Sequence, residues 1–290
     1  MIRRIGVYLE MIKAAHTVFA LPFALVGMFL ASRELGLPHA LPAPRTIFFI
    51  LLAMVGARSA AMGFNRLADA RLDAMNPRTK DRAIPSGKVS LGQARMFVAA
   101  SSCLLVYAAL KLNPLAFMLS PALLLLLFFY SYTKRFTWTS HLFLGACLGA
   151  APLAAWIAVT GEVDARILSI CFAVMFWTAG FDVLYALSDI EFDRATGLHS
   201  IPRFLGVEKS LWTARVFHLV MAAWLLLSYH LFGLGWLYLK GLVFIFAVLV
   251  YEHSIINKDD LSRLDMAFFN LNGVVSIAYC VFTYLDLAIR

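Results

Sequence analysis

Runs of apolar residues long enough to cross a lipid bilayer recur along almost the whole chain, and they limit the possible folds more than any other feature. An α-helix needs about 20 predominantly apolar residues to span the hydrocarbon core. Such windows lie at about residues 14–32, 47–64, 96–112, 114–133, 141–160, 167–185, 213–232, 235–251 and 266–285. The sequence therefore predicts an all-α, polytopic membrane protein with nine transmembrane helices.

The composition supports this prediction and argues against a large domain outside the membrane. Hydrophobic residues make up 62% of the chain and charged residues 14%, and the mean hydropathy is +0.80. In soluble proteins about a quarter of all residues are charged. We therefore expect a single membrane domain over residues 1–290. The net charge of +8 is spread over loops between spans, which does not indicate a nucleic-acid partner.

The distribution of basic residues predicts the orientation in the membrane. If the N-terminus lies inside, most of the 25 Lys and Arg residues fall in the inner segments. Basic residues accumulate in cytoplasmic loops. The sequence thus predicts a multi-pass protein of the inner (cytoplasmic) membrane, with the polar segments 65–95 and 186–212 on the cytoplasmic side.

Those two polar segments carry the same spacing of carboxylates. The first reads Asn65-x-x-x-Asp69-x-x-x-Asp73, and the second reads Tyr185-x-x-x-Asp189-x-x-x-Asp193. In a helix, residues four apart share one face, where two carboxylates repel each other. A divalent cation removes that repulsion, and Mg²⁺ is usually bound by one or two carboxylates together with phosphate oxygens. We therefore predict that Asp69, Asp73, Asp189 and Asp193 bind Mg²⁺ and a diphosphate.

Basic and phenolic residues near the two motifs fit the same interpretation. Arg82, Lys134 and Arg135 are candidates for charge-assisted contacts to the diphosphate, and Tyr130 and Tyr185 are candidate hydrogen-bond donors. A diphosphate whose developing charge is neutralised is a good leaving group. If the attached chain is allylic, its departure leaves a carbocation, which aromatic faces stabilise.

Two charged residues are predicted to lie deeper in the membrane than the motifs. Arg58 precedes Asn65 by seven residues, and Asp182 precedes Asp189 by the same interval, which is two helical turns. Ionisable groups inside a membrane usually face a cavity or a partner. They indicate either a polar pocket below the metal site or an Arg58–Asp182 ion pair that stabilises helix packing. His16 is expected to be a capped or hydrogen-bonded helix residue, and lining the pocket is the alternative.

The motifs resemble those of a known family. The run from Asn65 to Thr79 looks like the first motif of the UbiA superfamily of intramembrane prenyltransferases, and Asp189 to Asp193 with Gly197 looks like the second. The resemblance covers essentially the whole chain. It implies helices around a central cavity that opens sideways to lipid, Mg²⁺ as cofactor, and a polyprenyl diphosphate as donor. The implied reaction is electrophilic aromatic substitution in quinone biosynthesis.

The resemblance also implies roles for single residues. Asn65 would assist the metal-binding carboxylates, and Lys134, Tyr185, Tyr130 and Arg82 would contact or neutralise the diphosphate. Arg58 would hold the carboxylate of an aromatic acid, with 4-hydroxybenzoate the obvious acceptor. Asp182 would orient the acceptor or help to remove a proton. No obligate protein partner is implied.

The acceptor and the reaction class each leave an alternative. Residues 12–23 depart from the usual 4-hydroxybenzoate enzymes and look more like a branch linked to the futalosine route to menaquinone, with 1,4-dihydroxy-6-naphthoate as acceptor. A CDP-alcohol phosphotransferase is a second enzyme class, but its expected acidic signature does not occur here. An ion-coupled membrane transporter is the non-catalytic alternative.

Overall fold

The computed structural model describes residues 2–13, 19–257, 261 and 263–289, with helices throughout and no strand among them. These residues form two compact units. The first unit comprises Met1–Thr17 and Pro44–Tyr132, and the second comprises Val18–Ala43 and Thr133–Arg290. Each unit is described by itself.

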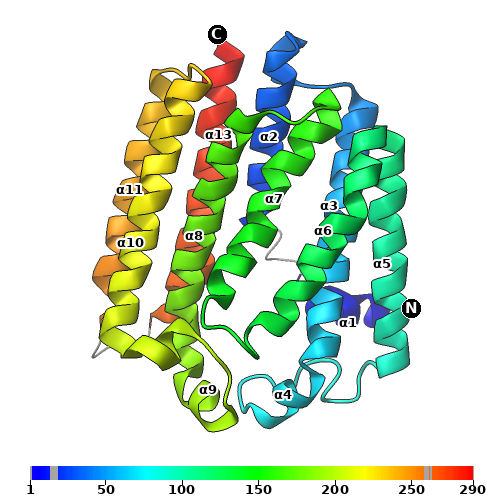
Figure 1. Ribbon diagram of the computed structural model, residues 1–290, viewed down its shortest axis with the longest axis vertical. Coiled ribbons are helices and arrows are strands. Elements are labelled where there is room, and N and C mark those ends of the chain that lie inside the picture. The colour runs from blue at the N-terminus through cyan, green and yellow to red at the C-terminus, as the bar shows by residue number, and fades with distance from the viewer. Residues whose placement is uncertain (1, 14–18, 258–260, 262, 290) are drawn as a thin grey trace. The chain divides into compact units, whose positions relative to one another are not determined.

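The first unit consists of three long helices and two short ones. They are α1 (Ile2–Met11), α3 (Pro44–Ala68), α4 (Ala70–Met75), α5 (Leu91–Leu112) and α6 (Pro114–Thr133), which ends at the first residue of the second unit (Figure 1). Helices α3 and α5 pack along each other. Their close approach requires Gly56, because a Cβ there would lie 2.6 Å from the backbone nitrogen of Leu105.

The second unit is built around α8, which packs against α7 and α10. Its elements are α2 (Leu21–Glu34), η2 (Pro38–Ala40), α7 (Ser140–Thr160), η3 (Ala165–Ile167), α8 (Leu168–Ala186), η4 (Leu187–Asp189), α9 (Ile190–Thr196), α10 (Ile201–Leu231), α11 (Trp236–Ile255), α12 (Leu264–Met266), η5 (Ala267–Leu271) and α13 (Asn272–Ile289). Trp156, Trp177 and Tyr238 are among its fully buried large side chains.

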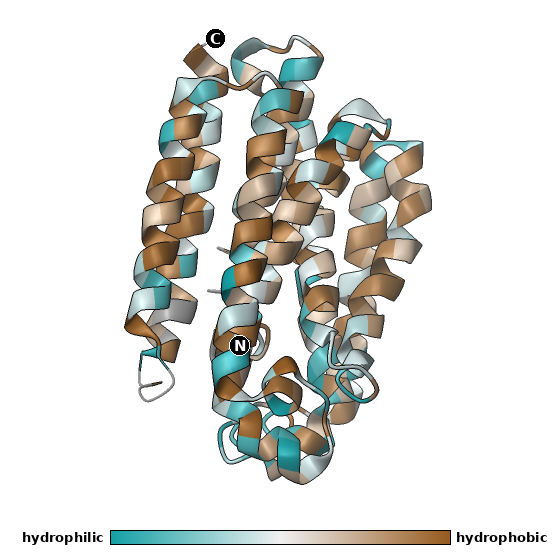
Figure 2. Cartoon of the chain, turned by 60° about the vertical axis from the view of Figure 1, so that its left-hand side comes forward, coloured by the Kyte–Doolittle hydropathy of each residue, from teal (hydrophilic) through white to brown (hydrophobic). Residues whose placement is uncertain are grey.

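The helices confirm the prediction of a polytopic all-α membrane protein. Eight helical segments within the described residues are long and apolar enough to cross a membrane. They correspond to eight of the nine predicted windows. The remaining window, 14–32, corresponds to α2, which is 14 residues long, and residues 14–18 lie outside the described part of the chain. Figure 2 shows hydrophobic residues along the long helices.

A glycine allows α2 and α7 to approach each other closely. A Cβ on Gly27 would overlap the carbonyl oxygen of Pro152 on α7. Packed interiors tolerate no such overlap. The two helices therefore touch backbone to backbone at this point.

Local sequence signals explain several of the helix ends. Ser90 and Gln93 form a reciprocal capping box at the start of α5. Helix α7 ends at Thr160 and is followed by its C-cap Gly161, whose φ of 74° is in the left-handed region that favours glycine. Helix α10 begins after the N-cap Ser200 and is broken at Gly206, which has φ 78° and ψ 175°.

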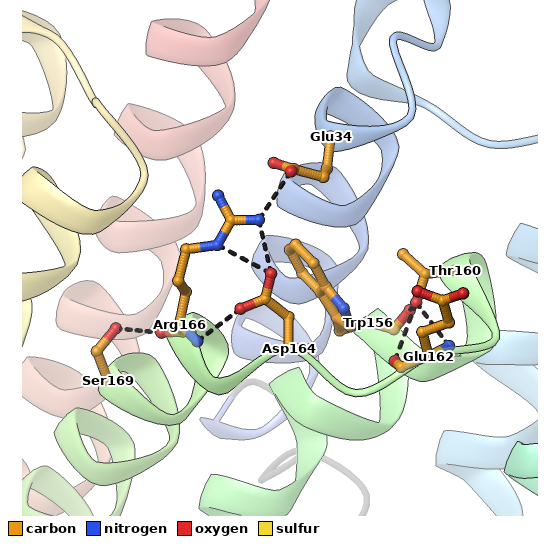
Figure 3. A network of polar contacts seen from close by, with 7 residues as sticks. All are labelled: Glu34, Trp156, Thr160, Glu162, Asp164, Arg166 and Ser169. Atoms are coloured by element: carbon orange, nitrogen blue, oxygen red, sulfur yellow. Dashed lines mark hydrogen bonds and ion pairs between the residues drawn. The ribbon is translucent and has the colours of Figure 1, made fainter.

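An ion-pair network joins three elements of the second unit (Figure 3). Nη2 of Arg166 on η3 donates to Oδ2 of Asp164 at 2.6 Å and to Oε1 of Glu34, the last residue of α2, at 2.7 Å. The same guanidinium lies 5.6 Å from the ring centroid of Phe232, which directly follows α10. Arg166 thus holds α2, η3 and the end of α10 together.

Candidate active site

The first acidic motif lies where α3 ends and α4 begins. The backbone hydrogen bonds continue through it, with Asp69 N–H donating to Asn65 C=O at 2.9 Å and Asp73 N–H to Asp69 C=O at 2.8 Å. Asp69 itself has φ −98° and ψ 8°, which interrupts regular helix geometry. The two carboxylates thus stay one turn apart, as the spacing predicts, but on a bent segment.

The second motif has the same backbone construction in the other unit. Asp189 has φ −108° and ψ 4°, and it separates the 3₁₀ turn η4 from the short helix α9, which carries Asp193. In each motif the first aspartate therefore stands at a bend and the second stands in the short helix that follows. This correspondence matches the shared spacing of the two sequences.

The side chains of the first motif form a connected set. Nδ2 of Asn65 donates to Oδ2 of Asp69 at 3.0 Å, and Nη1 of Arg82 lies 2.7 Å from Oδ1 of Asp73. The hydroxyl of Thr79 donates to the carbonyl oxygen of Asp73 at 3.0 Å. The structure thus brings Asn65 and Arg82, two of the predicted residues, directly to the carboxylates.

Arg66 is a member of this set that the sequence analysis missed. Its side chain is buried, with Nη1 at 3.9 Å from Oδ2 of Asp73 and at 3.4 Å from Oδ1 of Asn65. Its Nε donates to the carbonyl oxygen of Met11, at the end of α1, at 3.4 Å. The available signal was the interval of seven residues from Arg66 to Asp73, which is two helical turns.

Each unit has one buried carboxylate oxygen that is suited to a divalent cation. Oδ2 of Asp73 and Oδ2 of Asp193 are buried and accept no hydrogen bond from the described residues, and Asp193 is only 1% exposed. A buried carboxylate oxygen without a hydrogen bond is costly, and a bound cation removes that cost. Within the described residues no three or more His, Cys, Asp or Glu side chains gather into a complete metal site. A cation held in part by phosphate oxygens does not need one.

Asp182 on α8 has a partner that the sequence analysis did not identify. Its Oδ2 lies 2.6 Å from Nδ1 of His141 on α7, and the exposed fractions of the two side chains are 19% and 0%. Nε2 of His141 accepts the backbone N–H of Ile201, the first residue of α10, at 3.3 Å. A histidine in an apolar span was the signal, because such residues are rare there and usually have a function.

The remaining diphosphate candidates are divided between the two units. Lys134 follows α6, and its carbonyl oxygen accepts the N–H of His199 at 2.7 Å, which ties this turn to the chain after the second motif. Tyr185 is half-buried on α8, and Arg135 is exposed; both belong to the second unit. Tyr130 is half-buried in the first unit. Their roles stay predictions.

Arg58 lies on α3, as predicted, and contacts the chain after α1. Its Nη2 donates to the carbonyl oxygen of Lys13 at 3.1 Å, and its Nε is buried with no acceptor among the described residues. Arg58 and Asp182 therefore each have a partner within their own unit. The proposed acceptor contact stays a prediction. His16 lies outside the described residues.

Comparisons with known proteins agree with the sequence motifs. The model of the UbiA prenyltransferase family matches residues 20–274. The chain is 32% identical over 237 residues to a 4-hydroxybenzoate octaprenyltransferase of Vibrio parahaemolyticus, covering 81% of this chain and 82% of that protein. It is 33% identical over 244 residues to a protoheme IX farnesyltransferase of Alkalilimnicola ehrlichii, covering 81% and 77%.

Solved structures agree as well. The apo structure of a UbiA homologue from Aeropyrum pernix has a TM-score of 0.83 and 33% identity, covering 93% of this chain and 98% of that one. A UbiA homologue from Archaeoglobus fulgidus, solved with GPP and Mg²⁺, has a TM-score of 0.75 at 18% identity, covering 97% and 99%, which shows a shared fold. The chain is a membrane-embedded prenyltransferase and belongs to the UbiA prenyltransferase family.

Proposed function

We propose that this enzyme transfers a polyprenyl group from a polyprenyl diphosphate to an aromatic acid of the 4-hydroxybenzoate type, in a reaction that depends on Mg²⁺. The observation that carries the proposal is the pair of bent acidic motifs, each ending in a buried aspartate with a carboxylate oxygen that lacks a hydrogen bond. Prenyl diphosphate and Mg²⁺ are what the homologous structure from Archaeoglobus fulgidus contains.

Asp69, Asp73, Asp189 and Asp193 would hold Mg²⁺ and, through it, the diphosphate. When bound, the metal neutralises the charge that develops on the leaving diphosphate. Arg82 is placed to contact the same group, since it already lies on Asp73. Asn65 orients Asp69 through its amide. Lys134, Arg135, Tyr130 and Tyr185 would contribute further donors to the phosphate oxygens.

The reaction then proceeds on the organic groups. The bond between the prenyl carbon and the diphosphate oxygen breaks, and its electron pair leaves with the diphosphate. The ring carbon ortho to the phenolic hydroxyl of the acceptor forms a new bond to the prenyl carbon, and its proton passes to the released diphosphate or to water. Arg58 would bind the acceptor carboxylate with donors that Lys13 does not use. Asp182 would accept a hydrogen bond from the phenolic hydroxyl, which orients the acceptor and raises the electron density of its ring.

Three acceptors are candidates for this reaction. Relatives of similar identity include a 4-hydroxybenzoate enzyme and a protoheme enzyme. Residues 12–23 favour a third acceptor, 1,4-dihydroxy-6-naphthoate, as the alternative. Both aromatic acids carry the carboxylate that Arg58 would recognise. They differ in the number of fused rings, which is one in the benzoate and two in the naphthoate. The membership in a transferase family favours an enzyme over the transporter considered from sequence.

The test is a prenylation assay on membranes that contain the protein. Geranyl diphosphate and Mg²⁺ are supplied with 4-hydroxybenzoate or 1,4-dihydroxy-6-naphthoate in parallel, a third reaction contains protoheme with farnesyl diphosphate, and products are identified by mass. The Asp189→Asn variant, produced at an equal level in the membrane, is the matched control. We expect an adduct on the benzoate that requires both Mg²⁺ and Asp189.

Each other outcome changes the proposal in a defined way. An adduct on the naphthoate alone would keep the chemistry and assign the enzyme to menaquinone synthesis. An adduct on protoheme alone, or equal activity of the Asp189→Asn variant, would contradict the proposal. We further propose that the motifs face the cytoplasm, as the basic loops indicate. A cysteine at the exposed position Lys80, labelled by an impermeant reagent only in inverted vesicles, would support that orientation.

A further inference from the structure

The hydrogen bonds around His141 determine which ring nitrogen carries the proton. A backbone N–H can only donate, so Nε2 of His141 must accept from Ile201 and therefore has no proton. The proton then lies on Nδ1, which faces Oδ2 of Asp182 at 2.6 Å. The imidazole is thus neutral and donates to the carboxylate. Both hydrogen bonds are made within the second unit.

This contact leaves one oxygen of Asp182 available. Oδ1 has no hydrogen-bond partner among the described residues, and the side chain keeps 19% of its surface exposed, whereas His141 has none. His141 therefore cannot reach a substrate itself. It fixes the orientation of the Asp182 carboxylate through Oδ2 and leaves Oδ1 to a ligand. In enzymes a buried neutral partner of this kind selects the geometry of the group that contacts substrate.

His141 also joins the two ends of the segment that carries the second motif. Asp182 precedes Asp189 and Asp193, and Ile201 follows them. One imidazole contacts the first and the last of these positions. The backbone N–H of Ile201 is one of the donors at the start of α10 that need a partner outside the helix.

We propose that His141 is a positioning residue for acceptor prenylation: through its Nδ1–H it holds Asp182 as an oriented carboxylate whose Oδ1 accepts the hydrogen bond of the acceptor hydroxyl. This inference rests on the proposed function, because it assigns a partner to a residue of the proposed acceptor site. It predicts that His141 affects the acceptor half of the reaction and leaves binding of the prenyl diphosphate unchanged.

Two substitutions separate this role from a purely structural one. In His141→Asn, the amide nitrogen takes the place of Nδ1, so it can still donate to Asp182 while the contact to Ile201 is lost. In His141→Gln, the amide oxygen reaches the place of Nε2, so it can still accept from Ile201 while the contact to Asp182 is lost. Each variant therefore removes one of the two hydrogen bonds that the His141 side chain makes.

The measurement is steady-state prenylation by the purified full-length protein, together with the KM for geranyl diphosphate and the thermal unfolding midpoint. We expect His141→Gln to lower kcat by about 10- to 100-fold, as the loss of an outer partner commonly does, with an unchanged KM for the diphosphate. His141→Asn should retain most of the activity. The reverse ranking, or equal loss in both variants that follows the fall in unfolding midpoint, would overturn the proposal.

A second measurement keeps the proposal falsifiable if the Gln variant fails to fold. In wild-type protein with ¹⁵N-labelled histidine, the His141 signal, identified by its absence in His141→Asn, should show a proton on Nδ1 and none on Nε2. A proton on Nε2 would overturn the proposal. If wild-type protein prenylates no acceptor, the proposed function fails instead, and the tautomer measured at His141 still tests the contact.

Discussion

Nη1 of Arg82 lies 2.7 Å from Oδ1 of Asp73, nine residues earlier in the chain, and Oδ2 of the same carboxylate is buried without a hydrogen bond. Oδ1 of Asp73 is thus held by Arg82, while Oδ2 has Nη1 of Arg66 at 3.9 Å, beyond hydrogen-bond distance, and can still accept a further ligand. This arrangement orients the carboxylate before a metal or a diphosphate arrives.

Removal of Arg82 should weaken binding of the prenyl diphosphate. A hydrogen bond to a charged group contributes about 1.5–3 kcal/mol, so Arg82→Ala should raise the KM for geranyl diphosphate by about 10- to 100-fold. The control is Arg71→Ala, which removes an exposed arginine of α4. Initial rates at varied diphosphate and fixed acceptor give both values. A KM within twofold of wild type would contradict the assignment of Arg82.

Neutralising Asp193 should lower the activity without lowering the stability of the metal-free protein. Asp193 is 1% exposed and has an unpartnered oxygen, so its charge is costly in the metal-free protein. Asp193→Asn should lower prenylation by about 100-fold or more, since it removes a proposed metal ligand. It should leave the metal-free unfolding midpoint equal to or above that of wild type.

The matched control is Glu191→Gln on the same short helix, where the side chain is 81% exposed. This variant should behave as wild type in both assays. Wild-type protein should gain stability from Mg²⁺ together with geranyl diphosphate, and Asp193→Asn should not. A similar gain in the Asn variant would remove Asp193 from the metal site.

The contact between α2 and α7 should be sensitive to a single methyl group. In Gly27→Ala the new Cβ would overlap backbone atoms of Pro152, which cannot rotate away as a side chain can. We expect a loss of about 3 kcal/mol, the upper end of the usual cost of overpacking. Thermal unfolding in detergent measures it. Gly92→Ala in α5, where the only neighbour is Ser90 Oγ at 3.9 Å, is the control and should be neutral.

The network at Arg166 should make stability depend on acid pH. Hydrogen bonds from Arg166 lower the pKa of Asp164 below its ordinary value of 3.8. A carboxylate with a lowered pKa in the folded state stabilises the protein above the unfolded pKa and loses this effect as the pH falls through the folded one. Wild type should therefore unfold at a higher temperature than Asp164→Asn at pH 6, and the difference should shrink below about pH 4.

The size of this effect is limited by exposure of the network. Arg166 and Glu34 are 35% and 46% exposed, and such pairs contribute about 0.2–1 kcal/mol. Glu162→Gln, which alters an exposed carboxylate of the same loop, is the control. A difference between wild type and Asp164→Asn that stays constant from pH 7 to pH 3 would contradict the titration of Asp164.

The spans and the one-turn spacing within each acidic motif could be predicted because both depend on local sequence spacing. Window 167–185 and helix α8 (Leu168–Ala186) agree closely. Window 213–232 missed the first turns of α10, since Arg203, Glu208 and Lys209 lower the hydropathy there although the helix already begins at Ile201. The bends at Asp69 and Asp189 were not predicted, because four-residue spacing alone indicates a continuous helix.

Residues whose role depends on contacts between distant elements were harder to find. His141, Asp182 and Ile201 come from α7, α8 and α10, and no spacing in the sequence relates them. Arg66 is distinguished in the sequence only by its interval of seven residues from Asp73. Its place among Met11, Asn65 and Asp73 became visible only from the position of α1.

The position of α1 also has a practical consequence for anyone who produces this protein. The carbonyl oxygens of Met11 and Lys13 accept hydrogen bonds from Arg66 and Arg58. Trimming the first thirteen residues would deprive two guanidinium groups of acceptors close to the first acidic motif. Affinity tags are therefore better placed away from this N-terminal stretch.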